Sequence, residues 1–223
     1  MSNPRGILIV ISGFSGAGKG TVVNELVKDK DSYALSISMT TRNPRPGDVD
    51  GVNYFFVTKD KFESTIKEGG LLEYAVYCDN YYGTPKKYVE DQLSAGKNVI
   101  LEIEIQGALK IKEQFEDAVL FFITPPSIDE LVRRLRARGT ETEDVIMKRV
   151  TRAAEEAKGI EEYDYLIVND QLDECVSNIK NVVAAAKTAP KRNRQFIGRL
   201  RDELAANLKG EEITCYIPHI QIL

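Results

Sequence analysis

The core of this chain is organised around Gly13-Phe14-Ser15-Gly16-Ala17-Gly18-Lys19-Gly20-Thr21, which follows the apolar run at residues 7–11. The order of a buried strand, a glycine-rich loop and a helix is the context that the phosphate-binding pattern G-x-x-x-x-G-K requires. Glycines let such a loop bend tightly, so that its backbone N–H groups and the positive end of the following helix face an anion. A glycine-rich turn without a ligand is the alternative, but the glycine spacing, the lysine and the flanking elements all favour a phosphate site.

Lys19 and the residues after it specify what the loop would hold. The lysine of this pattern reaches the β- and γ-phosphates of a nucleotide, and a nearby hydroxyl normally serves Mg²⁺. The position after Lys19, usually Ser or Thr, is Gly20, and the hydroxyl comes one residue later at Thr21. The spelling G-K-G-T also occurs in nucleoside monophosphate kinases, and we therefore expect Thr21 to lie near the metal and the phosphates.

Apolar segments alternate with helical patterns along the chain. Strands are expected near residues 7–11, 99–105, 119–123 and 166–168, with helices between them. This order predicts an α/β fold: a parallel sheet core flanked by helices on both faces, with ligands at the carboxyl ends of the strands. A small mixed α/β lobe is expected at about 38–88, and a helical lid at about 127–158. The sheet core, the lobe and the lid are expected to form one domain at 4–187, followed by a C-terminal extension of unknown role at 188–223.

Composition excludes several classes of protein. The 223 residues are 43% hydrophobic and 29% charged, as in ordinary soluble proteins, and their net charge of −4 disfavours a broad nucleic-acid surface. No apolar run approaches a membrane span and residues 1–5 do not resemble a signal peptide, so a cytoplasmic location is expected. The three cysteines are widely spaced and the only histidine is His219, so neither a disulfide framework nor a zinc site is indicated.

The predicted lobe carries candidates for binding a second phosphate. Arg42 and Arg45 lie on a proline-stiffened loop, with Ser38 before it and Tyr54 and Tyr82 in the same lobe. Two guanidinium groups and several hydroxyls can clamp a phosphate through bidentate hydrogen bonds. A solvated surface loop with ordinary arginines is the alternative.

Three glutamates interrupt apolar strands. Glu73 lies within an apolar and aromatic run, where a carboxylate should face a partner; it could accept the ring N–H and the amino group of guanine, which adenine cannot offer in the same way. Glu102 and Glu104 end the predicted strand at 99–105, and side chains two apart on a strand share a face. One of them could serve Mg²⁺ and the other a second nucleotide. Solvated carboxylates are the alternative for all three.

Four arginines occupy the two predicted lid helices on either side of Gly139: Arg134, Arg138, Arg149 and Arg152. Mobile arginines of this kind stabilise the charge on a transferring phosphoryl group, and closure of a lid excludes water. A solvated pair of helices laced with salt bridges is the alternative, because the segment is also rich in glutamate.

In order and spacing, several further segments resemble guanylate kinase over residues 6–186. They include the T-T-R-x-x-R-x-G segment at 40–47, Gly51-Val52-Asn53-Tyr54, Tyr81-Tyr82-Gly83-Thr84, Glu102-Ile103-Glu104-Ile105-Gln106-Gly107 and Arg138-Gly139-Thr140-Glu141. The chain departs from a common form of the pattern at Glu102 and Glu104, where the family often has aspartate.

The resemblance implies a role for each matching residue. ATP would be bound by Gly13, Phe14, Ser15, Gly16, Ala17, Gly18, Lys19, Gly20, Thr21 and Asn169. The GMP phosphate would be bound by Ser38, Arg42, Arg45, Tyr54 and Tyr82, and the guanine by Glu73, Thr84 and Glu104. Thr21 and Glu102 would serve Mg²⁺, directly or through water. Catalytic roles are implied for Lys19, Arg42, Arg138 and Arg149.

The activity implied by the resemblance is direct in-line transfer of a phosphoryl group from ATP to GMP, with ATP and GMP as partners and no nucleic acid or membrane. A related binding module without catalysis is one competing hypothesis, but such a module would not need Lys19 or the lid arginines. Another nucleoside monophosphate kinase is the second. The sequence leaves open whether the protein is a monomer or a homo-oligomer.

Overall fold

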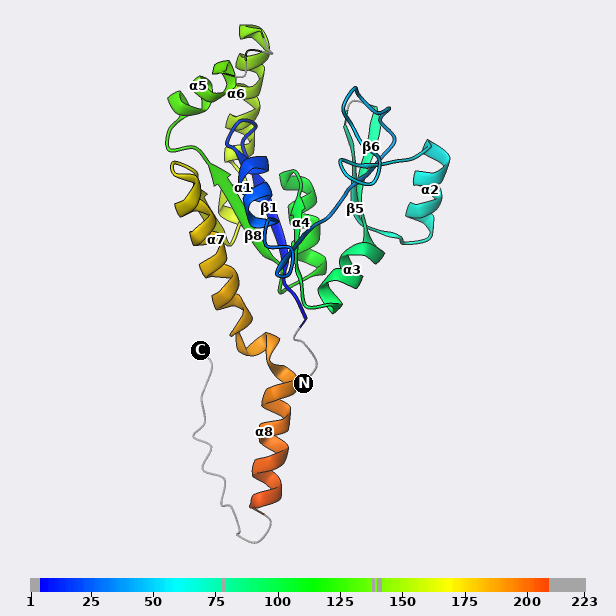
Figure 1. Ribbon diagram of the computed structural model, residues 1–223, viewed down its shortest axis with the longest axis vertical. Helices are drawn as coiled ribbons and strands as arrows, with labels where there is room; N and C mark the ends of the chain where they lie inside the picture. The colour runs from blue at the N-terminus through cyan, green and yellow to red at the C-terminus, as the bar shows by residue number, and fades with distance from the viewer. Residues whose placement is uncertain (1–4, 78, 138, 140–141, 209–223) are drawn as a thin grey trace. The chain divides into compact units, whose positions relative to one another are not determined.

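The computed structural model describes residues 5–77, 79–137, 139 and 142–208. These residues group into two compact units that divide between Ala186 and Lys187. Because the positions of the two units relative to each other are not determined, each is described by itself (Figure 1).

A five-stranded parallel sheet forms the centre of the first unit. Its strands lie in the order β2 (Tyr33–Leu35), β7 (Asn98–Glu102), β1 (Leu8–Gly13), β8 (Val119–Thr124) and β9 (Tyr165–Val168). Ile9, Ile11 and Phe121 are fully buried, as expected for strands covered on both faces. The register pairs Ile11 with Glu102, so the phosphate-loop strand and the strand of the acidic pair end side by side. The predicted parallel sheet is confirmed.

Helices flank this sheet as the sequence predicted. Those that follow core strands are α1 (Lys19–Leu26), α4 (Ile105–Gln114), α5 (Ile128–Ala137) and α7 (Leu172–Lys187). Helix α6 (Glu143–Ala157) follows α5, and α3 (Lys86–Ser94) precedes β7. In Figure 1, α7 and α4 lie on opposite sides of β1 and β8. At the start of α5, the Ser127 hydroxyl accepts a 3.1 Å hydrogen bond from the Glu130 N–H and so caps the helix.

A second, mixed sheet forms the lobe between β2 and α3. Its order is β4 (Phe55–Phe56), β3 (Met39–Thr40), β6 (Asn80–Pro85) and β5 (Leu71–Tyr77). Strands β5 and β6 make an antiparallel hairpin. Helix α2 (Lys59–Lys67) begins at Thr58, whose hydroxyl caps the Lys61 N–H, and its buried Phe62 stacks on Tyr81 with ring centroids 5.0 Å apart. The Arg42 loop connects β3 to β4 and is not helical.

One predicted element was wrong at its end. The strand expected at 99–105 ends at Glu102, and α4 begins at Ile105 with Glu104 in its N-cap position. Beyond the ladder, the buried Ser12 hydroxyl donates a 2.6 Å hydrogen bond to the Ile103 carbonyl, which satisfies that group as the chain turns. Glu102 and Glu104 are therefore not neighbours on one strand face.

The second unit contains a short 3₁₀ helix (Pro190–Arg192) and α8 (Arg194–Asn207). Asn193 lies between them, and its side-chain amide donates hydrogen bonds to the Lys187 and Ala189 carbonyls at 3.0 and 2.9 Å. The expectations for His219, Cys78 and Cys215 fall on residues outside those described. Within the described ranges, no helix combines the length and the apolar composition needed to cross a membrane.

Candidate active site

The loop between β1 and α1 has the backbone shape of an anion site. Gly18 has a left-handed φ of +91° and lies at the N-cap of α1, where a Cβ atom would be 2.5 Å from the Asn169 amide nitrogen. A Cβ at Gly13 would lie 2.1 Å from the Ile123 carbonyl oxygen. Only glycine fits at these two positions, and the resulting bend presents the start of α1 to a hollow.

That hollow has a volume of about 280 Å³ and is polar. Its lining comprises Ser15, Gly16, Gly18, Lys19, Gly20, Thr21 and Glu102. Lys19 Nζ donates hydrogen bonds to the carbonyls of Gly13 and Phe14, at 2.7 and 3.2 Å. These bonds hold the ammonium group over the loop, where a nucleotide phosphate would meet it.

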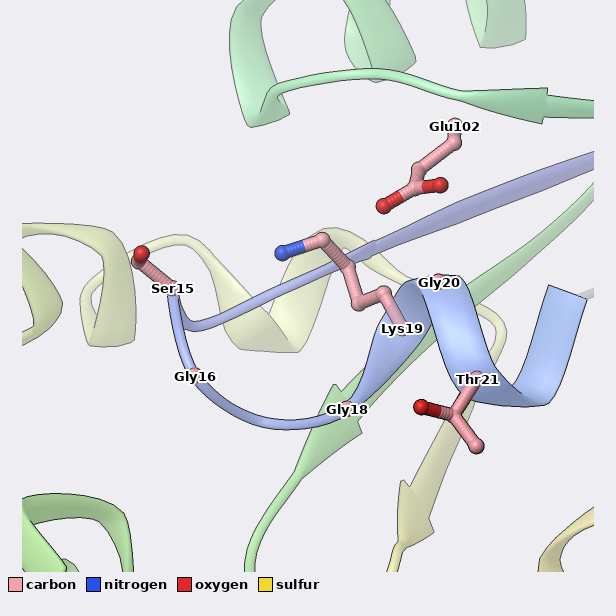
Figure 2. A pocket seen from close by; sticks show the side chains of 7 residues that line it. All are labelled: Ser15, Gly16, Gly18, Lys19, Gly20, Thr21 and Glu102. Atoms are coloured by element: carbon pink, nitrogen blue, oxygen red, sulfur yellow. The ribbon is translucent and has the colours of Figure 1, made fainter. Parts of the chain in front are cut away.

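Glu102 and Thr21 approach the hollow from different directions. Figure 2 shows the Glu102 carboxylate on the same side of α1 as Gly20, and the Thr21 hydroxyl on the opposite side of the helix. Desolvation by the surrounding protein raises the pKa of Glu102, while Lys19 opposes that shift. Glu102 and Thr21, the two residues predicted to serve Mg²⁺, thus both line the hollow, but their side-chain oxygens do not lie together.

The donor set is nevertheless suited to magnesium. Among the described residues, no group of three or more His, Cys, Asp or Glu side chains could hold a metal alone. Mg²⁺ is usually bound by one or two carboxylates together with substrate phosphates and water. Glu102 is a carboxylate facing a phosphate hollow, so it fits that mode, and the N–H groups of Gly20 and Thr21 belong to the first turn of α1.

Residues from the predicted lid and from the segment just after β9 support the loop. Arg149 of α6 donates a short hydrogen bond to the Ser15 hydroxyl. Asn169 donates to the Ala17 carbonyl at 2.8 Å, and Arg134 reaches the carbonyls of Asn169 and Ala17 at 2.9 and 3.4 Å. The sequence indicated Arg134 only as one of the lid arginines. Its hydrogen bond to the Ala17 carbonyl of the glycine-rich loop was not predicted. Arg138 lies outside the described residues.

In the lobe, Arg42 is brought together with aromatic side chains. Its guanidinium carbon lies 5.4 Å from the Tyr54 ring centroid and 5.5 Å from that of Phe56, and Tyr54 meets Tyr82 edge to face at 5.9 Å. Arg45 is exposed on the same loop, and Ser38 is half-buried just before β3. This arrangement brings the Arg42 guanidinium group together with the rings of Tyr54 and Tyr82.

Glu73 is buried in the lobe with a defined partner. Its side chain is 8% exposed, and its Oε1 accepts a 2.6 Å hydrogen bond from the Thr84 hydroxyl. Burial raises the pKa of Glu73, and the Thr84 bond and the charge of Lys110 oppose that rise. The solvated alternative for Glu73 is therefore excluded, and its second carboxylate oxygen, Oε2, lies beside Gly107 of α4.

Glu104 differs from the other candidates. Its side chain is 71% exposed and pairs with Arg152 of α6 at 2.9 Å, and Arg152 also binds Glu156 at 2.9 Å. The sequence did not indicate this link between the start of α4 and the lid helix.

Comparison with known proteins agrees with this geometry. The family model described as "Guanylate kinase" matches residues 5–186. Curated guanylate kinases from Desulfitobacterium hafniense and Clostridium perfringens are 48% and 50% identical, over 86% and 94% of this chain and 96% and 94% of their own lengths. A crystal structure of guanylate kinase from Anaplasma phagocytophilum, 33% identical, superposes with a TM-score of 0.69 over 85% of this chain and 90% of its own. This chain belongs to the guanylate kinase family.

Proposed function

We propose that this protein transfers the γ-phosphoryl group of ATP to GMP, giving ADP and GDP. The observation that carries the proposal is the presence, in one unit, of a phosphate loop with Lys19 and a lobe with the buried Glu73–Thr84 pair. The first supplies a donor site, and the second supplies a base-reading carboxylate. Membership of the guanylate kinase family supports the same assignment.

ATP is the donor in this proposal. Its phosphates bind the N–H groups of residues 13–21 and the ammonium group of Lys19, and its adenine lies near Asn169. Glu102 would hold Mg²⁺ bound with ATP, directly or through water, and the ion would offset the negative charge of the phosphates. A role for Thr21 at the same ion would need its hydroxyl to move from the opposite side of α1. Arg134 and Asn169 keep the Ala17 carbonyl in place, and so keep the loop in its binding shape.

GMP is the acceptor. Arg42 and Arg45 bind its phosphate with hydroxyls from Ser38, Tyr54 and Tyr82. Glu73 and Thr84 read the guanine edge, because an ionised carboxylate accepts both of its N–H donors. Glu104 also contacts guanine in this proposal, through the carboxylate that pairs with Arg152 in the structure.

The transfer itself needs no covalent intermediate on the protein. The GMP phosphate is already an anionic nucleophile, so the protein aligns the two phosphates and neutralises their repulsion. Arg149, together with Arg138, is proposed to stabilise charge on the moving phosphoryl group, and lid closure to exclude water. Release of product after the lid opens is a candidate for the slowest step.

The decisive experiment is a coupled assay of ADP formation with Mg²⁺, ATP and each of GMP, AMP and UMP. Turnover that depends on GMP and is abolished by chelating the metal would support the proposal. Absence of turnover with GMP, from protein that is folded by circular dichroism, would favour a binding module without catalysis. Faster turnover with AMP or UMP would identify another nucleoside monophosphate kinase.

The cytoplasmic location stays a prediction, as does the absence of nucleic-acid and membrane partners.

A further inference from the structure

The loop between β3 and β4 carries Arg42 and Arg45, the two arginines proposed to bind the acceptor phosphate. The carboxylate of Asp48 contacts both of them. Its Oδ2 accepts a 2.8 Å hydrogen bond from Arg42 Nη2 and another of 2.8 Å from the backbone N–H of Arg45. The backbone N–H of Asp48 in turn donates to the Arg45 carbonyl at 2.9 Å. One side chain therefore closes the Arg45–Asp48 turn and fixes the head group of Arg42.

Arg42 is held on its other sides as well. Its Nη1 donates a 2.8 Å hydrogen bond to the Asn43 carbonyl, and its guanidinium plane lies over the rings of Tyr54 and Phe56. The Arg42 and Asp48 side chains are only 13% and 18% exposed. An ordinary surface arginine samples many rotamers, whereas this one has a single supported position.

We propose that Asp48 is a positioning residue for the acceptor phosphate: it orients the Arg42 guanidinium and sets its spacing from Arg45 before the phosphate binds. This inference rests on the proposed function, in which Arg42 and Arg45 bind the GMP phosphate. A guanidinium carries five N–H groups, and the described residues accept from two of those on Arg42. The remaining donors are presented in a fixed fork, so less conformational entropy is lost when the anion binds.

A carboxylate beside a phosphate site could act in the opposite way, by repelling or competing with the phosphate. The geometry favours positioning, because the same Oδ2 is tied to the Arg45 N–H and cannot leave without opening the turn. The hydrogen bonds from the Arg45 backbone and from Arg42 hold the pKa of Asp48 below its ordinary value, so the group stays ionised at neutral pH. The two roles predict opposite changes in GMP affinity.

The test compares Asp48→Asn with a matched control in the same loop, Asp50→Asn. Asp50 also caps a backbone N–H, that of Phe56 at 2.9 Å, but none of its described contacts reaches Arg42. Asp48→Asn should raise KM for GMP about tenfold, the effect of weakening one charge-assisted hydrogen bond, and leave KM for ATP unchanged. Asp50→Asn should change neither KM.

Binding of GMP and of guanosine, measured by calorimetry without ATP, isolates the phosphate. Asp48→Asn should weaken binding of GMP about tenfold and leave binding of guanosine unchanged, since guanosine has no phosphate for Arg42 to hold. This readout does not depend on turnover. If the unchanged chain bound GMP but made no GDP, the proposed function would fail while the role of Asp48 would still be measured.

Three results would overturn the inference. A lower KM for GMP in Asp48→Asn would make the carboxylate a competitor of the phosphate. An equal rise in the KM values for GMP and ATP would reduce Asp48 to a structural residue of the loop. An equal loss of GMP affinity in Asp48→Asn and Asp50→Asn would show that any weakened turn has the same effect.

Discussion

The hydroxyl of Thr84 on β6 donates a 2.6 Å hydrogen bond to Oε1 of Glu73 on β5, inside the lobe. The other oxygen, Oε2, lies beside Gly107 of α4, where a Cβ atom would approach it to 3.2 Å. The Thr84 hydroxyl thus binds one oxygen of the buried Glu73 carboxylate, and the missing side chain at Gly107 leaves room for the other. Such an orientation suits a group that must accept two parallel N–H donors from a planar base.

Replacing Glu73 by glutamine should separate acceptor binding from donor binding. The amide keeps one acceptor oxygen for Thr84 but replaces the other with an NH₂ group, which cannot accept a guanine N–H. We expect KM for GMP to rise about 10- to 100-fold, as for loss of a hydrogen bond to a charged group, with KM for ATP little changed. Steady-state kinetics with each nucleotide varied in turn measure this. An equal effect on both nucleotides would contradict the role assigned to Glu73.

The pH dependence of GMP binding should report the ionisation of Glu73. Burial raises its pKa above 4.5, and only the ionised group accepts both N–H donors, so KM for GMP should rise as the pH falls through that raised value. The GMP phosphate also takes up a proton near pH ~6. The ratio of KM values for the unchanged chain and Glu73→Gln removes that contribution; a ratio independent of pH would argue against the assignment.

The same shift has a consequence for stability. Because the folded-state pKa of Glu73 is raised, its carboxyl group favours folding while protonated, and this contribution is lost as the pH rises through that pKa. Glu73→Gln cannot ionise. The unfolding midpoint of Glu73→Gln, minus that of the wild-type protein, should therefore increase as the pH increases from acidic to neutral. Calorimetric scans without nucleotide over this range provide the measurement, and a difference that stays constant with pH would count against a buried, ionised Glu73.

Two glycines of the phosphate loop should respond oppositely to alanine. Gly18→Ala forces a left-handed φ of +91° on a residue with a side chain and brings Cβ to 2.5 Å from Asn169, so we expect a loss of about 1–2 kcal/mol or more in the free energy of unfolding. A Cβ atom at Gly20, which lies in α1, would have no neighbouring atom within 4 Å. Gly20→Ala should therefore be neutral or stabilising, by up to about 1 kcal/mol. Denaturant unfolding of both variants decides the matter.

Arg149 should be needed for transfer more than for binding. Removal of one group that stabilises transition-state charge lowers kcat by about 100-fold or more, so Arg149→Ala should show such a loss with a smaller change in KM for ATP. Arg133→Ala is the matched control on the neighbouring helix, because the side chain of Arg133 is 68% exposed and pairs with Glu130. Similar kcat values for the two variants would remove Arg149 from the transfer step.

The sequence by itself determined the parallel sheet, the helices between its strands and the strand–loop–helix order around Lys19, because each depends on residues close together in the chain. The alternation of apolar strands with helices and the glycines of the loop are local signals of that kind. The end of β7 was misjudged because Ile103 and Ile105 continue an apolar pattern, while the chain in fact turns where Ser12, distant in sequence, binds the Ile103 carbonyl.

Only the tertiary structure decided which charged groups meet. Composition left Glu73 free to face water or a partner, and packing of β5, β6 and α4 buried it beside Thr84. Glu104 looked equivalent to Glu102, yet the start of α4 carries it outward to Arg152. The sequence did not indicate a role for Asp48, because that role depends on the fold of the loop, which brings Arg42 and the Arg45 N–H to one carboxylate oxygen. Side-chain partners depend on distances across the fold, which sequence spacing does not encode.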